Sequence, residues 1–325
     1  MRAILCAKPA DPPELTLGDI PVPEPGPGQV RVRVKAAGVN FADTLMVRGT
    51  YQARPALPFV PGMELAGSID ALGPGVKSFA VHQRVLATVE HGAFAEYALA
   101  RAADCAPLPG AMDDATAAAF PIVYGTAHAG LEWRAGLRRG ETLLVLGAAG
   151  GVGLAAVEIG KAMGARVLAA AGGAERCKLA LSHGADLAID YRREDLREAV
   201  KMHTGGAGVD VVFDPVGGDL SDAALRCLGW EGRLIVVGFA AGRVPAIPAN
   251  LLLIQNVAAI GLFWGAYRAR NPDKLAASLD ALLSWWDQGV LKPFVSERFP
   301  LARAGDALER LAKRQARGKI AIEIG

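Results

Sequence analysis

A glycine-rich turn is the feature of this chain best suited to chemistry on a phosphorylated ligand. The segment 144-LVLGAAGGVG-153 joins a strand-like run to a helix-like run. Gly150 and Gly151 would let the backbone approach a pyrophosphate where a Cβ would collide, and Gly153 would let the helix pack tightly on the strand. The first N–H groups of that helix are free to bind an anion. The turn therefore predicts a dinucleotide site, although Ala148 replaces the first glycine of the usual G-x-G-x-x-G pattern.

The end of the next strand, roughly 20 residues further on, indicates which dinucleotide is favoured. A carboxylate there would bind the ribose 2′-hydroxyl of NAD and repel a 2′-phosphate, whereas an arginine would do the reverse. The sequence 171-AGGAER-176 has small residues where the acid would stand, and then Arg176, which can bind a phosphate bidentately. Glu175 precedes it, but its side chain would point about 100° away on a helix. The segment favours NADPH over NADH; the alternative is that Arg176 is a solvated arginine at a helix start.

These motifs lie in a stretch where strand-like and helix-like runs alternate strictly. Such alternation predicts a parallel sheet covered on both faces, the doubly wound α/β fold. The earlier part of the chain is rich in short strand-like runs with Gly and Pro turns and predicts a β-rich domain. The last strand-like run, 319–324, is too small to stand alone and is expected to pair with that domain. We therefore expect a nucleotide domain, residues 123–264, inserted into a domain formed by residues 1–122 and 265–325.

The composition is that of a globular protein. Of its 325 residues, 52% are hydrophobic and 21% are charged, and 35 basic against 33 acidic residues leave a net charge of +2. This balance offers no broad basic face for nucleic acid. The apolar run 251–264 is interrupted by Gln255 and Asn256 and falls short of the ~20 residues of a membrane helix. The first residues do not resemble a signal peptide, so we expect a cytoplasmic enzyme.

No local metal-binding motif is present. The sequence contains neither C-x-x-C nor H-E-x-x-H, so a metal or redox site could only be assembled from distant residues. The scattered candidates are Cys6, Cys105, Cys177, Cys227, His82, His91, His128, His183 and His203.

A set of short motifs spread along the chain is specific in combination. They are 38-GVNFADT-44, 61-PGMELAG-67, 147-GAAGGVG-153, 190-DYRREDL-196, 214-DPVGG-218 and the region from 238-GFAAG-242 to 261-GLFWG-265. With them, the chain resembles the zinc-free quinone oxidoreductase (zeta-crystallin-like) branch of the medium-chain dehydrogenase/reductases over essentially its whole length. The resemblance implies a Rossmann domain inserted into a GroES-like catalytic domain.

The resemblance also bears on zinc. Zinc-dependent relatives place a Cys and a His where this chain has Asn40 and Met63, and their four-cysteine zinc lobe is missing after Val85. Neither Asn nor Met would complete a Cys/His zinc site, so no metal is expected. The feasible chemistry is then hydride delivery to an acceptor that is already electrophilic, such as a quinone or an α,β-unsaturated carbonyl.

Three catalytic residues are implied by the resemblance. Asn40 and Asp43 are expected beside the nicotinamide, and Tyr51 is expected to line the substrate cleft with a hydroxyl able to bind or protonate the reduced acceptor. Two alternatives stay open, in which Tyr51 is a packing residue and Asp43 orders its loop. Glu64, which has lost its metal-site context, is expected to be a structural carboxylate.

The resemblance further implies a cofactor site. Thr126 is expected near the nicotinamide phosphate, Tyr191 near the adenosine phosphate, and Lys319 near the diphosphate. Two loops are expected over the nicotinamide ring, although Trp264 could be a core aromatic instead. The predicted cofactor-binding residues are Asn40, Thr126, Gly150, Gly151, Val152, Gly153, Gly173, Arg176, Tyr191, Gly238, Phe239, Ala240, Phe263, Trp264 and Lys319.

We therefore expect an NADPH-dependent, zinc-independent oxidoreductase that reduces quinones. The enzymatic alternative is a reductase of 2-alkenals, enones or enoyl thioesters, and the non-enzymatic one is an NADPH-bound structural or RNA-binding protein. Residues 257–263 resemble the edge strand through which this family pairs two sheets, and an exposed apolar edge needs cover, so a homodimer is expected.

Overall fold

The computed structural model describes residues 1–11 and 13–325 and divides into two compact units. The first unit comprises Met1–Ile122, Asn271–Leu283 and Pro293–Gly325, and the second comprises Val123–Arg270 and Ser284–Lys292. None of the described helices is long and apolar enough to cross a membrane.

The first change from one unit to the other falls after Ile122. Residues 265–270 and 284–292 lie in the second unit. The indole ring of Trp285 lies 5.7 Å from the ring of His128 in an edge-to-face arrangement, a geometry that aromatic pairs favour. Such contacts attach residues 284–292 to a unit whose other residues lie far away in the sequence. Hydrophobic periodicity does not show these contacts.

The second unit is built on one six-stranded sheet in the order β10-β9-β8-β11-β12-β13, and every neighbouring pair is parallel. The strands are β8 (Thr142–Leu146), β9 (Arg166–Ala171), β10 (Leu187–Asp190), β11 (Val209–Asp214), β12 (Leu228–Val236) and β13 (Ala258–Gly261). The central strands β8, β9 and β11 are almost uniformly apolar and buried, as expected for a parallel sheet covered on both faces, whereas the edge strand β13 is only partly buried. The predicted doubly wound Rossmann-like fold is confirmed.

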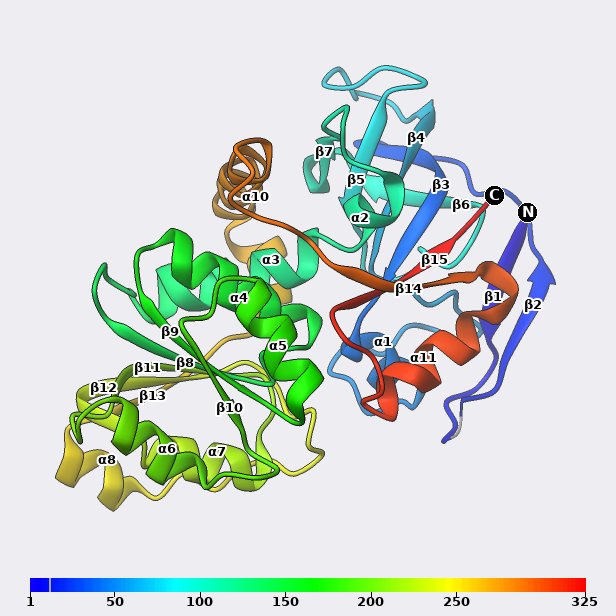
Figure 1. Cartoon of the computed structure of the whole chain (residues 1–325). Coiled ribbons are helices and arrows are strands. Elements are labelled where there is room, and N and C mark those ends of the chain that lie inside the picture. The colour runs from blue at the N-terminus through cyan, green and yellow to red at the C-terminus, as the bar shows by residue number, and fades with distance from the viewer. Residues whose placement is uncertain (12) are drawn as a thin grey trace. The chain divides into compact units, whose positions relative to one another are not determined.

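Helices cover both faces of this sheet (Figure 1). Helices α4 and α5 lie on one face, and α6 and α7 lie on the other. The helices of this unit are α4 (Gly151–Ala162), α5 (Ala174–Ser182), α6 (Leu196–His203), α7 (Gly218–Leu225), α8 (Ala249–Gln255) and α9 (Tyr267–Arg270); α3 (Pro121–His128) begins just before it, and α10 (Pro272–Asp287) is divided between the units. Because the sheet is parallel, the carboxyl ends of its strands meet along one edge, where ligands of doubly wound folds bind.

The first unit contains a seven-stranded sheet in the order β14-β15-β3-β4-β5-β7, with β6 also paired to β3, and a separate pair β1-β2. Its strands are β1 (Arg2–Cys6), β2 (Leu15–Asp19), β3 (Gln29–Val39), β4 (Glu64–Leu72), β5 (Arg84–Thr88), β6 (Tyr97–Arg101), β7 (Cys105–Pro107), β14 (Val295–Pro300) and β15 (Lys319–Glu323). The last strand, β15, pairs antiparallel with β3, as the sequence predicts. Consequently the end of the chain lies beside residues that precede it by about 280 positions.

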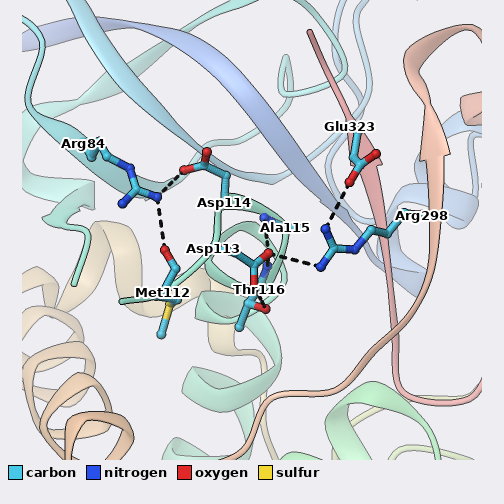
Figure 2. A network of polar contacts seen from close by, with 8 residues as sticks. All are labelled: Arg84, Met112, Asp113, Asp114, Ala115, Thr116, Arg298 and Glu323. Carbon is cyan, nitrogen blue, oxygen red and sulfur yellow. Dashed lines mark hydrogen bonds and ion pairs between the residues drawn. The ribbon is translucent and has the colours of Figure 1, made fainter. Parts of the chain in front are cut away.

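Short helices complete the first unit: α1 (Phe41–Val47), α2 (Asp114–Ala118) and α11 (Ala304–Ala312). Figure 2 shows how α2 is fixed at its N-terminus. The Asp113 carboxylate accepts hydrogen bonds from the backbone N–H groups of Ala115 and Thr116, both at 3.1 Å, and pairs with Arg298. The adjacent Asp114 pairs with Arg84 at 2.7 Å. Capping and ion pairs thus fix α2, a helix too short to be stable alone, against the sheet.

Candidate cofactor-binding and active site

The glycine turn after β8 has the close packing that its sequence suggests. Gly147 adopts a φ of 59°, which a residue with a side chain rarely tolerates, and Ala148 is not among the residues with positive φ. Gly150 is the N-cap of α4. A Cβ at Gly153 would collide with the carbonyl oxygen of Gly147. The turn therefore brings the first N–H groups of α4 to the carboxyl edge of the sheet with no side chain in between.

The end of β9 carries no acidic side chain and is flanked by hydrogen-bond donors from the neighbouring strand. A Cβ at Gly172 would lie 2.9 Å from the Tyr191 hydroxyl oxygen and 3.1 Å from Nε of Arg192. Gly173 has a φ of 101° and is the N-cap of α5, which carries Arg176 in its first turn. The predicted residues Gly173, Arg176 and Tyr191 thus lie on adjoining segments. Arg192, which follows Tyr191, lies beside Gly172 as well and is not among the residues predicted from the sequence.

Two further loops meet at the same edge of the sheet. The buried Asp214 carboxylate, at the end of β11, accepts hydrogen bonds from the N–H groups of Val216 (2.8 Å) and Gly217 (2.9 Å). The Ala241 N–H donates to the Val216 carbonyl at 2.7 Å, and a Cβ at Gly217 would lie 3.1 Å from the Phe239 ring. These contacts join 214-DPVGG-218 to the loop that holds the predicted residues Gly238, Phe239 and Ala240.

Trp264 packs against α3 within the second unit. A Cβ at Gly125 would lie 2.7 Å from the Trp264 ring, so this glycine admits the indole beside the predicted residue Thr126. The Trp264 Nε1 atom is buried and has no hydrogen-bond partner among the described residues, whereas the neighbouring Phe263 is 53% exposed. A buried N–H donor without an acceptor is rare in folded proteins. At Trp264 it therefore favours a ligand-binding role over the alternative of a core aromatic.

The first unit contains a buried polar cluster made by Asn40, Glu64 and Lys319. The Lys319 ammonium donates to Glu64 Oε1 at 2.7 Å, to Asn40 Oδ1 at 2.8 Å and to the Val39 carbonyl at 2.9 Å. Asn40 Nδ2 also donates to Glu64 Oε1 at 2.9 Å, and the Ile122 N–H donates to Glu64 Oε2 at 2.9 Å. The Asn40 amide is therefore held in one orientation by two oppositely charged groups, as in a fully satisfied polar network.

Lys319 binds groups of the protein itself, whereas the resemblance places it near the cofactor diphosphate. Its side chain is only 7% exposed, and its three N–H donors match the three acceptors around it. A contact with the cofactor diphosphate would require one of these bonds to be given up. Glu64 is fully buried and ties β4, β15 and Ile122 together, which is the structural function expected of it.

Asp43 lies next to this cluster and is fully buried. Its Oδ2 accepts the Asn40 N–H at 2.8 Å, while its Oδ1 has no partner among the described residues. Burial raises the pKa of Asp43 from 3.8 to about 7, against the smaller effects of the Asn40 N–H and Lys319, which lower it. The pKa of Tyr51 is also raised, first by burial and then by the negative charge of Asp43. The two side chains are thus electrostatically coupled.

A zinc ion does not fit this cluster. Asn40 occupies the position of the expected cysteine and is already bound to Lys319 and Glu64, and Met63 offers only a thioether. Among residues 1–11 and 13–325, no group of three or more His, Cys, Asp or Glu side chains is arranged to hold a metal ion. The Lys319 ammonium, which donates to both Glu64 and Asn40, would also repel a cation.

Known families match the two parts of the chain. A family model described as an alcohol dehydrogenase GroES-like domain matches residues 26–110, and one described as a zinc-binding dehydrogenase matches residues 151–282. The first match falls in the unit with the buried cluster and the second largely in the unit with the parallel sheet.

Curated proteins and solved structures agree with these matches. Quinone oxidoreductase-like protein 2 of Bos taurus is 40% identical over 324 residues, which cover 99% of this chain and 92% of the relative. Quinone oxidoreductase of Rattus norvegicus is 35% identical over 311 residues, covering 95% and 93%. The crystal structure of Escherichia coli quinone oxidoreductase complexed with NADPH has a TM-score of 0.93 and 31% sequence identity, covering 99% of this chain and 100% of that one.

Proposed function

Because the chain belongs to the quinone oxidoreductase family of the medium-chain dehydrogenase/reductase superfamily, we propose that it reduces quinones with NADPH and without a metal ion. The observation that carries the choice of cofactor is the end of β9, which has two glycines and no acid. Tyr191 and Arg192 lie against this backbone, and Arg176 stands in the first turn of α5. Glycines that allow close approach, together with guanidinium donors, fit a 2′-phosphate.

The second unit would hold the cofactor along the carboxyl edge of its sheet. The N–H groups at the start of α4, exposed by Gly150, Gly151 and Gly153, would bind the diphosphate. The loop that contains Phe239 and the segment around Trp264 would cover the nicotinamide. When bound, NADPH supplies the hydride, so the protein has to provide orientation, exclusion of water and a proton.

The first unit would provide the proton. Reduction of a quinone to a hydroquinone adds one hydride from NADPH and one proton, which goes to an oxygen of the acceptor. We assign this proton to Tyr51 and Asp43: the Tyr51 hydroxyl would donate it, and Asp43, with its pKa of about 7, would replace it. A group whose pKa is near the working pH can both hold and release a proton. Asn40, fixed by Lys319 and Glu64, would orient the nicotinamide or the acceptor.

The direct test compares acceptors under anaerobic conditions. Oxidation of NADPH would be measured with an ortho-quinone, a para-quinone, an enone, a 2-alkenal and an enoyl thioester at matched concentrations. Turnover of a quinone at least tenfold faster than of the unsaturated carbonyl compounds supports the proposal. Efficient reduction of an enone with no quinone turnover would replace it by a double-bond reductase. In the same assay, Arg176→Ala should raise the KM for NADPH and leave the KM for NADH almost unchanged.

We also propose that the chain forms a homodimer through β13. This strand lies at the edge of the sheet and pairs only with β12 in the second unit. Ala258 and Gly261 on it are exposed, so an apolar edge with unpaired backbone groups would otherwise face water. Light scattering at several protein concentrations should give twice the chain mass. A proline in place of Ala259 should yield the monomer, whereas a monomeric wild-type protein would contradict the proposal.

A further inference from the structure

We propose that Arg192 is a specificity-determining residue for the 2′-phosphate of NADPH and that the Asp190 carboxylate holds it in place. This inference rests on the proposed use of NADPH. The Arg192 side chain lies beside the two glycines at the end of β9, Gly172 and Gly173. Its Nε would be 3.1 Å from a Cβ at Gly172, and its Nη1 would be 3.7 Å from a Cβ at Gly173. Any larger residue at position 172 would displace the guanidinium together with the Tyr191 hydroxyl, which would lie 2.9 Å from the same Cβ.

Asp190 connects the two strand ends on which this arrangement depends. It is the last residue of β10 and lies in register with Ala171, the last residue of β9. One oxygen, Asp190 Oδ1, accepts hydrogen bonds from the N–H of Gly173 at 2.8 Å and from the N–H of Arg192 at 3.1 Å. A single carboxylate oxygen therefore fixes the backbone of Arg192 next to Gly172 and Gly173.

The Asp190 carboxylate is occupied by backbone donors at Oδ1 and lies near Arg193 at Oδ2. The Gly173 N–H is the main cause that holds the pKa of Asp190 below its usual value, so the carboxylate is ionised and structurally engaged at neutral pH. The residue is also largely buried, at 9% exposure. It cannot serve as the acid that binds a ribose 2′-hydroxyl, because that acid ends the second strand of the fold, and Asp190 ends the third. Its role is that of a positioning residue.

The Arg192 guanidinium remains available for an anion. Throughout residues 1–11 and 13–325, no carboxylate lies within ion-pair distance of it, and its side chain is exposed. The neighbouring Arg193 differs, since its Nε lies 3.9 Å from Asp190 Oδ2 and its side chain is 80% exposed. A guanidinium set beside glycines, without an acid partner, offers the fork of donors that recognises a phosphate. Arg193 is thus a matched control of the same charge.

Equilibrium binding gives the test. The variants Arg192→Gln and Arg193→Gln would be titrated with NADPH and NADH, followed by nicotinamide fluorescence, and with 2′,5′-ADP and 5′-AMP, followed by calorimetry. Arg192→Gln should weaken the binding of NADPH and of 2′,5′-ADP by roughly 10- to 100-fold, the usual effect of losing a charged hydrogen-bond pair. Binding of NADH and of 5′-AMP should change by less than about threefold, and Arg193→Gln should change none of the four by more.

Three further variants test how the Arg192 guanidinium is positioned, and their thermal unfolding tests whether they fold. Asp190→Asn keeps an oxygen that can accept both N–H groups and should retain the preference for NADPH, whereas Asp190→Ala should lose it. Gly172→Ala should reproduce the selective loss of Arg192→Gln, because its Cβ would displace the guanidinium together with the Tyr191 hydroxyl. Thermal unfolding of each variant reports whether the fold is intact, so a selective loss in a folded protein cannot be a general structural defect.

The outcomes separate this inference from the proposed function. If the wild type prefers NADPH but Arg192→Gln and Gly172→Ala weaken NADPH and NADH equally, the assignment of Arg192 is wrong and NADPH dependence stands. If the wild type binds NADH as tightly as NADPH and 5′-AMP as tightly as 2′,5′-ADP, the proposed cofactor itself is wrong. Selective loss of the phosphorylated ligands in both variants supports the assignment.

Discussion

Asp43 should make the chain less stable at neutral pH than in mild acid, which is opposite to the usual effect of a paired carboxylate. Its pKa rises from 3.8 to about 7 on folding, mainly because of burial. Between about pH 4 and pH 7 the folded chain therefore holds a proton that the unfolded chain has released, and the free energy of unfolding falls as the pH rises. This shift corresponds to about 4 kcal/mol, fully lost above the folded-state pKa.

The substitution Asp43→Asn isolates this effect, because a neutral amide mimics the protonated acid. Its side-chain oxygen can still accept the Asn40 N–H, which Asp43 binds at 2.8 Å. Near pH 4 the variant should be about as stable as the wild type, and by pH 8 it should be more stable by up to about 4 kcal/mol. Urea unfolding followed by circular dichroism at a series of pH values measures this difference.

The matched control for Asp43→Asn is a second Asp→Asn substitution at an exposed position. Asp280→Asn removes an exposed carboxylate on α10 and should give a stability profile parallel to that of the wild type. If the profile of Asp43→Asn is also parallel to the wild-type profile, Asp43 does not carry the proton, and the role proposed for it in reduction loses its basis.

Three other predictions concern packing, the buried ion pair and metal. Gly153→Ala should destabilise the chain by about 2–3 kcal/mol, because its Cβ would collide with the Gly147 carbonyl; Gly150→Ala, whose Cβ would lie 3.4 Å from the same oxygen, should unfold at nearly the wild-type urea concentration. Lys319→Met should cost about 3–5 kcal/mol by leaving the Glu64 carboxylate buried and unpaired, and adding Glu64→Leu should recover part of that loss, as a double-mutant cycle would report. Dialysis against a chelator should leave quinone turnover unchanged, and stoichiometric zinc found by elemental analysis would overturn the metal-free assignment.

The features that could be predicted from the sequence are those in which the spacing of residues has a direct physical meaning. The strands of the second unit follow from short apolar runs that alternate with helical periodicity. Gly153 is needed because the carbonyl oxygen of Gly147, in the same turn, leaves no room for a side chain. The position of the last strand was also predictable, since a short isolated strand must find a partner.

What could not be predicted depends on side chains brought together from distant parts of the chain. Lys319 and Val39 are 280 positions apart, and no pattern in the sequence shows that a lysine near the end of the chain becomes the ammonium at the centre of a buried cluster. Arg192 was missed for a similar reason, because its position beside Gly172 depends on the pairing of β9 with β10. Sequence periodicity predicts elements, whereas tertiary register determines which side chains meet.

The charges of the cluster in the first unit explain why its proton is exchangeable near neutral pH. Lys319 and Glu64 form an ion pair at 2.7 Å whose charges cancel, so ionised Asp43 would leave one uncompensated negative charge in a fully buried position. Glu64 raises the pKa of Asp43 and Lys319 lowers it, and the larger effect of burial places it at about 7. The cluster is therefore neutral with one proton and anionic without it, and the two states are close in free energy near pH 7. A reduction that consumes one proton with each hydride can draw that proton from such a group, although the same group lowers the stability of the chain at neutral pH. The substitution Asp43→Asn, which should stabilise the chain at pH 8, should then slow the proposed reduction, a trade-off expected where a site keeps a destabilising charge for its chemistry.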